Sequence, residues 1–450
     1  MKTVSKPAPA RRRALLLATA VAPLALAVAV GPAAADAAPR ATRTAVLSAA
    51  QAAPAAAAAA EPSIAGMTSW SGKVTKTVDG DTDSIDIASD GLSGIPVRNA
   101  GIQAMERGEC HAIEAEEKLR ALTPVGTPVR LSARYASSTS QGRPLRHVDI
   151  VRPGYPVVDV QSTLLSGGYV LWDNISAEAS RATAYLVAAQ QAARSGKQMY
   201  DPDFCGSGPQ QSVPLKMWIN FDAEGDDQSN VNGEYVRVLN QGTEALSVGG
   251  WWLRASDHRT PLRFPAGTVI PAGKYVTLRV GSGTSSGSTY YWGKPEAFFP
   301  NETTSGYFGQ GMYLFDPQGD VRSSVLYPCV YACTDPGTGK LAITVVPNDP
   351  RYSSADQNKD EYAYLRNTGT GDINLSYHVV TAAGHVLELP AGVLLHAGET
   401  LTLRMGKGTG SRLEQFWGMS RPLPDAGGAL VVRTTENTRL ACRDWGSGSC

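Results

Sequence analysis

The second half of the chain contains an internal duplication, and this feature most restricts the fold. The segment RFPAGTVIPAGKYVTLRVGSGT at 263–284 returns as ELPAGVLLHAGETLTLRMGKGT at 388–409, an offset of 125 residues. The segment YYWGKP at 290–295 returns at the same offset as QFWGMS at 415–420. A repeat at a fixed period indicates two copies of one folding unit.

Each copy has the residue pattern of short β-strands. The stretch NGEYVRVLNQGT at 232–243 carries Val and Tyr between Gly and Asn, and its counterpart DEYAYLRNTGT at 360–370 carries Tyr and Leu between Asp and Asn. Strands of this length, separated by turns at regular spacing, predict an antiparallel β-sandwich. We therefore expect sandwiches at residues 214–333 and 341–450.

The N-terminus has the order of a secretory signal peptide. Basic residues up to Arg13 precede an apolar run at 14–30, and an Ala-x-Ala site follows at 35–37. The alternative, retention as a membrane anchor, is disfavoured because a span needs about twenty apolar residues and this run contains Pro23. We expect cleavage near Ala37, a secreted extracellular protein and no membrane span.

Residues 38–63 form an Ala/Pro-rich linker without an amphipathic face, which predicts disorder. The full chain has 41 basic and 41 acidic residues, so its formal net charge is zero. Without residues 1–37, which hold five basic residues and one acidic residue, it is mildly acidic. Such a chain has no global positive field to attract nucleic acid, so any nucleic-acid contact must be local.

Residues 64–208 have a different residue pattern from the repeats. Short alternating runs such as KVTKTVDG and TPVRLSARY predict strands. Helix-forming residues predict one helix over 110–122 and another that follows Ser176 and ends at Gly196. Strands with late helices indicate a small β-barrel of the OB type.

Six cysteines in an exported chain predict disulfides, and six allow fifteen connectivities. The domain arrangement favours one of them, because each sandwich ends in its own close pair and one pair falls inside the first domain. The three predicted disulfides are Cys110–Cys205, Cys329–Cys333 and Cys442–Cys450.

Four residues between 77 and 143 form a pattern with chemical meaning. Asp81 lies in Val-Asp-Gly-Asp-Thr, Arg98 lies in a predicted strand, Glu106 follows that strand, and Arg143 lies in Gln-Gly-Arg. In this order the motifs resemble the staphylococcal-nuclease-like (thermonuclease) family over about residues 73–208. The resemblance implies an OB-fold phosphodiesterase that cuts DNA and RNA with the help of calcium.

The same resemblance implies individual roles. Glu106 is the general base, Arg98 and Arg143 hold the phosphate, and Asp81 is a calcium ligand. The chain departs from the family pattern at Gln103, where an aspartate is usual, while Ala104 still offers a backbone carbonyl. Calcium affinity follows ligand charge, so we expect a weak calcium site or another divalent ion at Asp81, Gln103 and Ala104.

The repeats resemble the lamin tail domain, an immunoglobulin-like sandwich, through Gly-Glu-Tyr-Val at 233–236, Gly-Trp-Trp at 250–252 and Trp-Gly at 292–293. The predicted fold is therefore mainly β and multidomain, with an OB-fold-type barrel, helices and two such sandwiches. The repeats carry no catalytic pattern. We expect them to bind an extracellular or surface ligand, or to support the barrel.

Two interpretations of the barrel stay open at this point. In the first it is a nuclease. In the second it is a catalytically silent module of an extracellular binding or cell-surface protein, which Gln103, Met105 and the acidic balance favour. For Arg98 alone, a separate alternative is a strand arginine paired with a nearby aspartate. The nuclease interpretation requires Arg98, Glu106 and Arg143 to converge on one cleft beside Asp81.

Overall fold

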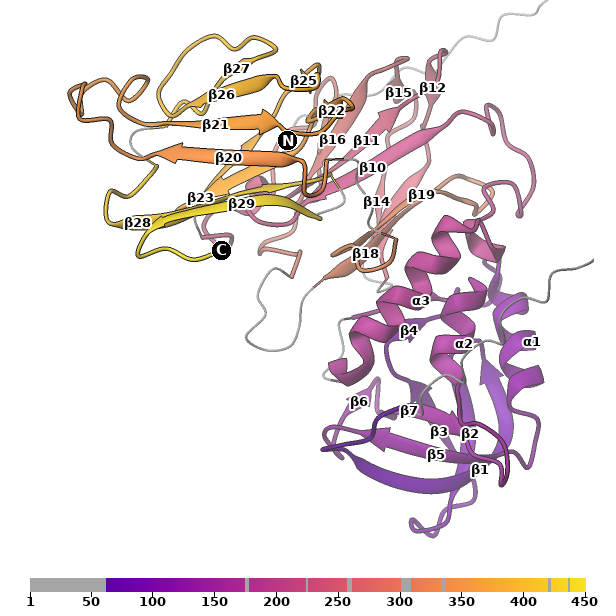
Figure 1. Ribbon diagram of the computed structural model, residues 1–450. Coiled ribbons are helices and arrows are strands. Elements are labelled where there is room, and N and C mark those ends of the chain that lie inside the picture. Colours follow the sequence, from indigo (N-terminus) through magenta and orange to yellow (C-terminus); the bar gives the residue numbers. More distant parts are fainter. Residues whose placement is uncertain are drawn as a thin grey trace, which may run out of the picture. The chain divides into compact units, whose positions relative to one another are not determined.

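The computed structural model (Figure 1) describes residues 62–174, 178–223, 226–256, 261–300, 309–332, 337–419, 422–435 and 438–450. The predicted signal peptide, the linker up to residue 61, Ser176 and Cys333 lie outside these residues. The described chain is mainly β, with a closed barrel followed by two immunoglobulin-like sandwiches, as the sequence predicts.

The barrel is closed by a pairing that is distant in sequence. Its sheet runs in the order β3-β2-β1-β5-β7, and β3 also pairs with β7 in parallel, through Arg98 opposite Leu145 and Asn99 opposite Arg146. Closure removes the free edges of the sheet. The barrel strands are β1 (Thr68–Asp79), β2 (Thr82–Ile87), β3 (Ile95–Asn99), β5 (Pro128–Ala133) and β7 (Arg143–Ile150).

Short strands extend this domain at its rim. β4 pairs with β9, which places Gln103 opposite Leu171, and both β6 and β8 pair with β7. These strands are β4 (Ile102–Gln103), β6 (Thr139–Ser140), β8 (Val158–Asp159) and β9 (Leu171–Trp172).

Helices lie beside the barrel strands (Figure 1). They are α1 (Ala112–Leu122), α2 (Val160–Gly167) and α3 (Ala182–Arg194), with single turns η1 (Ala179–Arg181) and η2 (Gln198–Tyr200). The sequence predicts α1 and α3 but not α2, an eight-residue helix that Asp159 caps by accepting a hydrogen bond from the Ser162 amide at 2.9 Å. Gly168 ends it at φ 76°, where a Cβ would lie 2.4 Å from the Lys197 carbonyl oxygen.

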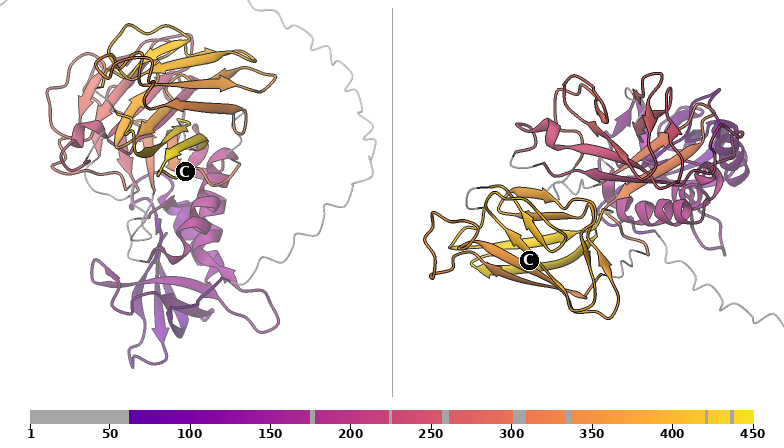
Figure 2. Two further views of the ribbon diagram at one scale, coloured as in Figure 1. Left: turned by 60° about the vertical axis from the view of Figure 1, so that its left-hand side comes forward. Right: turned by 90° about the horizontal axis from the view of Figure 1, so that it is seen from above.

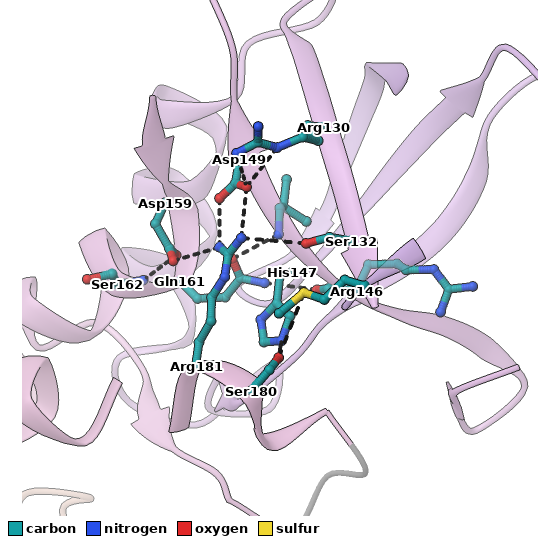
Figure 3. Close-up of polar contacts among 12 residues, drawn as sticks. Arg130, Ser132, Arg146, His147, Asp149, Asp159, Gln161, Ser162, Ser180 and Arg181 are labelled. Carbon is teal, nitrogen blue, oxygen red and sulfur yellow. Dashed lines mark hydrogen bonds and ion pairs between the residues drawn. The ribbon is translucent and has the colours of Figure 1, made fainter. Parts of the chain in front are cut away.

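A buried network of charges ties α3 to the barrel (Figure 3). Arg181 lies between two carboxylates, 2.7 Å from Asp149 and 2.8 Å from Asp159, and its guanidinium is directed at Asp149. Asp149 is fully buried and is also bound by Arg130 at 3.0 Å. Buried charges require such pairing, because an unpaired ion in the interior is very costly.

The two sandwiches repeat one strand order. In the first, the sheets run β10-β11-β16-β17 and β14-β13-β18-β19, with β12 paired to β15 and the turn η3 (Val231–Gly233) before β11. The strands are β10 (Leu215–Asn220), β11 (Tyr235–Asn240), β12 (Leu246–Ser247), β13 (Trp252–Ala255), β14 (Leu262–Arg263), β15 (Val269–Ile270), β16 (Tyr275–Arg279), β17 (Thr289–Tyr291), β18 (Gln310–Phe315) and β19 (Val321–Tyr327).

The second sandwich has the corresponding sheets β20-β21-β26-β27 and β24-β23-β28-β29, with β22 paired to β25. Its orange to yellow strands lie together as one body in both views of Figure 2. The strands are β20 (Leu341–Val346), β21 (Tyr362–Asn367), β22 (Ile373–Asn374), β23 (Val379–Ala382), β24 (His385–Glu388), β25 (Leu394–Leu395), β26 (Thr400–Arg404), β27 (Glu414–Phe416), β28 (Gly427–Arg433) and β29 (Arg439–Gly446).

The first sandwich has a hydrophobic core of its own and also contributes residues to the core of the barrel. The cluster that fills the barrel includes Tyr313 and Phe315 of β18, and the Tyr313 hydroxyl accepts a hydrogen bond from the Trp172 amide at 3.3 Å. Every residue of β18 is buried, whereas the matching strand β28 is mostly half-buried. The second sandwich has its own separate core.

Two of the predicted disulfides join described residues. Cys110 pairs with Cys205 and Cys442 with Cys450, as the sequence predicts. The third prediction, Cys329 with Cys333, falls outside the described residues. Among the helices that the structure describes, none is long and apolar enough to cross a membrane.

A buried carboxyl in the first sandwich gives a pH prediction. Burial raises the pKa of Glu234 from 4.5 to about 8, although the Phe298 and Phe299 amides donate to it. Between these pH values the unfolded chain has lost this proton and the folded chain keeps it, so stability falls as the pH rises. Glu234→Gln should therefore gain stability relative to wild type from about pH 5 to about pH 8.

Chemical denaturation of the two proteins across this pH range measures the difference. Glu244→Gln is the control, because it makes the same change at an exposed position of the same sandwich. A difference between Glu234→Gln and wild type that stays constant with pH would contradict the raised pKa.

Candidate functional site

A tight turn between β1 and β2 fixes Asp81. Gly80 packs so closely that a Cβ there would lie 2.6 Å from the Ala115 Cβ and 2.8 Å from the Ala104 Cβ. This position therefore needs glycine. The close approach brings Asp81 to the segment at 104, where the Ala104 amide donates to Asp81 Oδ2 at 2.7 Å.

Closure of the barrel brings the other predicted residues to the same place. Because β3 pairs with β7, the side of the barrel that carries Arg98 also carries the start of β7 at Arg143. A cavity of about 680 Å³ opens there. It is lined by every predicted site residue, namely Asp81, Arg98, Gln103, Ala104, Glu106 and Arg143.

Hydrogen bonds join the two predicted phosphate-binding arginines through the turn. Arg143 donates from Nη1 to the Thr82 hydroxyl at 3.1 Å, and that hydroxyl donates to Asp81 Oδ1 at 3.0 Å. Asp81 Oδ1 in turn lies 2.9 Å from Arg98 Nη1. Arg98 is thus paired with an aspartate, as the alternative for this residue expects, and at the same time lines the cavity.

Gln103 extends this network on the other side. Its Oε1 accepts a hydrogen bond from Arg98 Nη2 at 2.7 Å, and its Nε2 donates to the Ala104 carbonyl at 3.0 Å. The β4–β9 pairing holds the Gln103 backbone in place. The network therefore runs without a break from Arg143 to Ala104.

Burial controls the charge of Asp81. The side chains of Asp81 and Arg98 are each 6 % exposed. Burial raises the pKa of Asp81 to about 6, against the lowering effect of the Arg98 guanidinium, and the Asp79 carboxylate adds to the rise. Asp81 is therefore mainly ionised at neutral pH, when its charge is balanced by Arg98.

Glu106 is the exposed member of the set. It follows β4 in a turn where its amide donates to Glu109 Oε2 at 2.8 Å. The helix α1 begins six residues later, after His111, so Glu106 does not cap it. An exposed carboxylate at the cavity wall is placed to take a proton from water bound in the cavity.

The donor set does not fit calcium as it is arranged. Calcium takes six to eight oxygen ligands, preferably several of them carboxylates. Among the predicted ligands only Asp81 supplies a carboxylate, and its oxygens are bound by Arg98, Thr82 and Ala104. The oxygens of Gln103 and Ala104 also accept hydrogen bonds within the chain. Calcium binding here stays a prediction, which this arrangement of donors does not favour.

In the described part of the chain, one group of Cys, His and acidic side chains has metal-binding spacing, namely Cys110, His111 and Cys205. Its cysteines form a disulfide, which removes the thiolates that a metal would need. The His111 ring packs against the tilted Phe204 ring, with 4.6 Å between their centroids, and burial lowers the pKa of His111 to about 4. We assign this group a structural role.

The cavity contains residues that the sequence did not single out. Thr82 links Asp81 to Arg143, Arg107 lies at the exposed rim, and Asn99 and Asp173 line the wall. Thr82 had a visible signal, because it directly follows Asp81 in the turn. Asn99 and Asp173 gave no signal in the sequence, because they are 74 residues apart. The barrel and the β4–β9 pair bring both of them to the cavity.

Comparison with known proteins identifies one part of the chain. Residues 219–328 match the family model of the lamin tail domain. A search of curated proteins finds no match to the chain. The first sandwich is therefore similar to lamin tail domains, and the barrel is compatible with an OB fold.

Proposed function

We propose that the barrel is a phosphodiesterase domain that binds and hydrolyses nucleic acid outside the cell. The observation that supports it is the meeting of Arg98, Glu106 and Arg143 at one cavity. Guanidinium groups bind phosphate oxygens with two parallel hydrogen bonds, which suits two arginines on one wall. Export is supported by the disulfides, which persist in oxidising compartments.

The proposed roles follow from position and exposure. Arg143, half-buried at the start of β7, binds the phosphate from one side, and Arg107 at the rim attracts the negatively charged strand. Arg98 balances Asp81 and supplies positive charge for the phosphate oxygens as charge develops on them. Glu106 accepts the proton of the attacking water, whose oxygen bonds to phosphorus while the bond to the leaving ester oxygen breaks and that oxygen takes a proton from solvent.

Nothing in the overall charge of the domain supplies long-range attraction. Residues 64–208 hold 14 Lys and Arg against 16 Asp and Glu. The proposal therefore predicts modest affinity that depends on the arginines of the cavity.

The decisive experiment is digestion of single-stranded DNA, duplex DNA and RNA by residues 38–450, with chelator and with calcium, magnesium or manganese. Cleavage that Glu106→Gln abolishes would support the phosphodiesterase. Binding without cleavage in every buffer would favour the silent module of an extracellular binding protein, which the bound state of Asp81 and Arg98 also suits.

Arg143→Ala should weaken nucleic-acid binding by at least about tenfold, because the variant loses a charged phosphate contact. Fluorescence anisotropy with a labelled oligonucleotide measures the loss. Arg152→Ala is the control, because it removes an exposed arginine of the same domain that does not line the cavity. Equal affinity of the two variants would place the phosphate elsewhere.

A further inference from the structure

The side-chain amide of Gln103 has a fixed orientation. Its oxygen faces the Arg98 guanidinium, which only donates hydrogen bonds, and its nitrogen faces the Ala104 carbonyl, which only accepts them. Turning the amide over would bring donor to donor and acceptor to acceptor. The amide therefore acts as an adapter between a cation and a carbonyl.

A carboxylate at position 103 would not serve this purpose. One of its oxygens would accept from Arg98, but the other would lie against the Ala104 carbonyl oxygen, about where Nε2 now lies at 3.0 Å. Two oxygens at that distance repel unless a proton or a cation lies between them. The amide removes the need for a cation at this point of the cavity.

Elsewhere in the network, a side chain of the protein itself supplies the positive charge that Asp81 needs. Arg98 neutralises Asp81 at 2.9 Å in a buried setting, and the Ala104 amide binds the second oxygen of Asp81. A divalent ion held by Asp81 and the Ala104 carbonyl would compete with the Arg98 guanidinium and the Gln103 amide for these oxygens. Buried ion pairs resist loss of one partner, so the entering ion meets a strong penalty.

We propose that the Gln103 amide and the Arg98 guanidinium together take the place of a divalent cation, so that this cavity binds phosphodiester oxygens without metal. The inference rests on the proposed function for its ligand, a phosphodiester. The claim that the cavity does not bind a divalent ion does not need that ligand. It is argued only from the contacts among Asp81, Arg98, Gln103 and Ala104.

The test compares wild type with Gln103→Glu, which keeps the length of the side chain and replaces the amide nitrogen by oxygen. Gln141→Glu is the matched control, because it makes the same charge change in the same cavity, beside Arg143 instead of Ala104. Calcium binding is measured by calorimetry and by the melting temperature in calcium and in chelator. Binding of a labelled single-stranded oligonucleotide is measured in the same buffers.

For wild type and for Gln141→Glu, the melting temperature of each protein should be the same in calcium as in chelator. Neither should give a calorimetric signal with calcium. Gln103→Glu should melt lower in chelator and recover in calcium, since an ion that binds the folded state stabilises it. The affinity of wild type for the oligonucleotide should change by less than about twofold between buffers. For Gln103→Glu it should rise by at least about tenfold with calcium.

Calorimetric binding of one calcium ion to wild type, abolished by Asp81→Asn, would overturn the inference. So would equal calcium responses of Gln103→Glu and Gln141→Glu. If wild type binds no oligonucleotide in any buffer, the proposed function fails. The calcium measurements then still decide whether the amide replaces a cation.

Discussion

Arg181→Ala is expected to cost about 3–5 kcal/mol of folding stability, the range for a buried ion pair that loses one partner. The variant leaves Asp149 fully buried with Arg130 as its partner and removes the arginine contact of Asp159. The melting temperature and the denaturant midpoint measure the loss. It should be among the largest effects of any single substitution in the barrel.

Two comparison variants make this prediction specific. Arg181→Lys keeps the charge but loses the planar fork that contacts Asp149 at both oxygens, so its cost should be intermediate. Arg152→Ala removes an exposed arginine and should have little effect. A cost for Arg181→Ala below about 1 kcal/mol, the range of surface pairs, would mean that the network does not hold α3.

Glu106→Gln is expected to lower the rate of phosphodiester cleavage by at least about a hundredfold, because a positioned general base contributes factors of this size. Binding of the oligonucleotide should persist, since the arginines of the cavity are unchanged. The variant keeps the shape of the side chain, so its melting temperature should match that of wild type. Single-turnover cleavage and anisotropy separate the two effects.

The control is Glu117→Gln, which makes the same charge change on the exposed face of α1. It should cleave like wild type. Cleavage by Glu106→Gln at the wild-type rate would remove Glu106 from the proposed chemistry and leave the cavity as a binding site.

Sequence reasoning succeeded where the signal is local. Alternating residues predicted the strands, and the repeat predicted that the two sandwiches share a strand order. The helix α2 was not predicted, because its eight residues, from Val160 to Gly167, are too few to show a helical period. Asp159 gives the only capping signal. The barrel itself was predicted, but the strand pairing that closes it, with Arg98 opposite Leu145, was not, because pairing between such distant residues leaves no local pattern in the sequence.

The candidate site shows the same contrast between local features, which were predicted, and long-range contacts, which were not. The residue types at 81, 98, 103, 106 and 143 were visible in the sequence, and so was the missing aspartate at 103. Their mutual bonds were not visible. Whether Gln103 lies open for an ion or bridges Arg98 to Ala104 depends on side-chain directions that the β4–β9 pair fixes in space.

The contribution of the first sandwich to the core of the barrel has a consequence for how this chain is assembled. Tyr313 and Phe315 belong to the repeat by sequence and to the barrel by packing, and Trp172 donates to Tyr313 next to the strand that carries Gln103. The barrel and the first sandwich should therefore melt in a single cooperative step. One copy of the duplicated domain thus supplies part of the packing around the barrel, so the barrel depends on that copy for part of its stability.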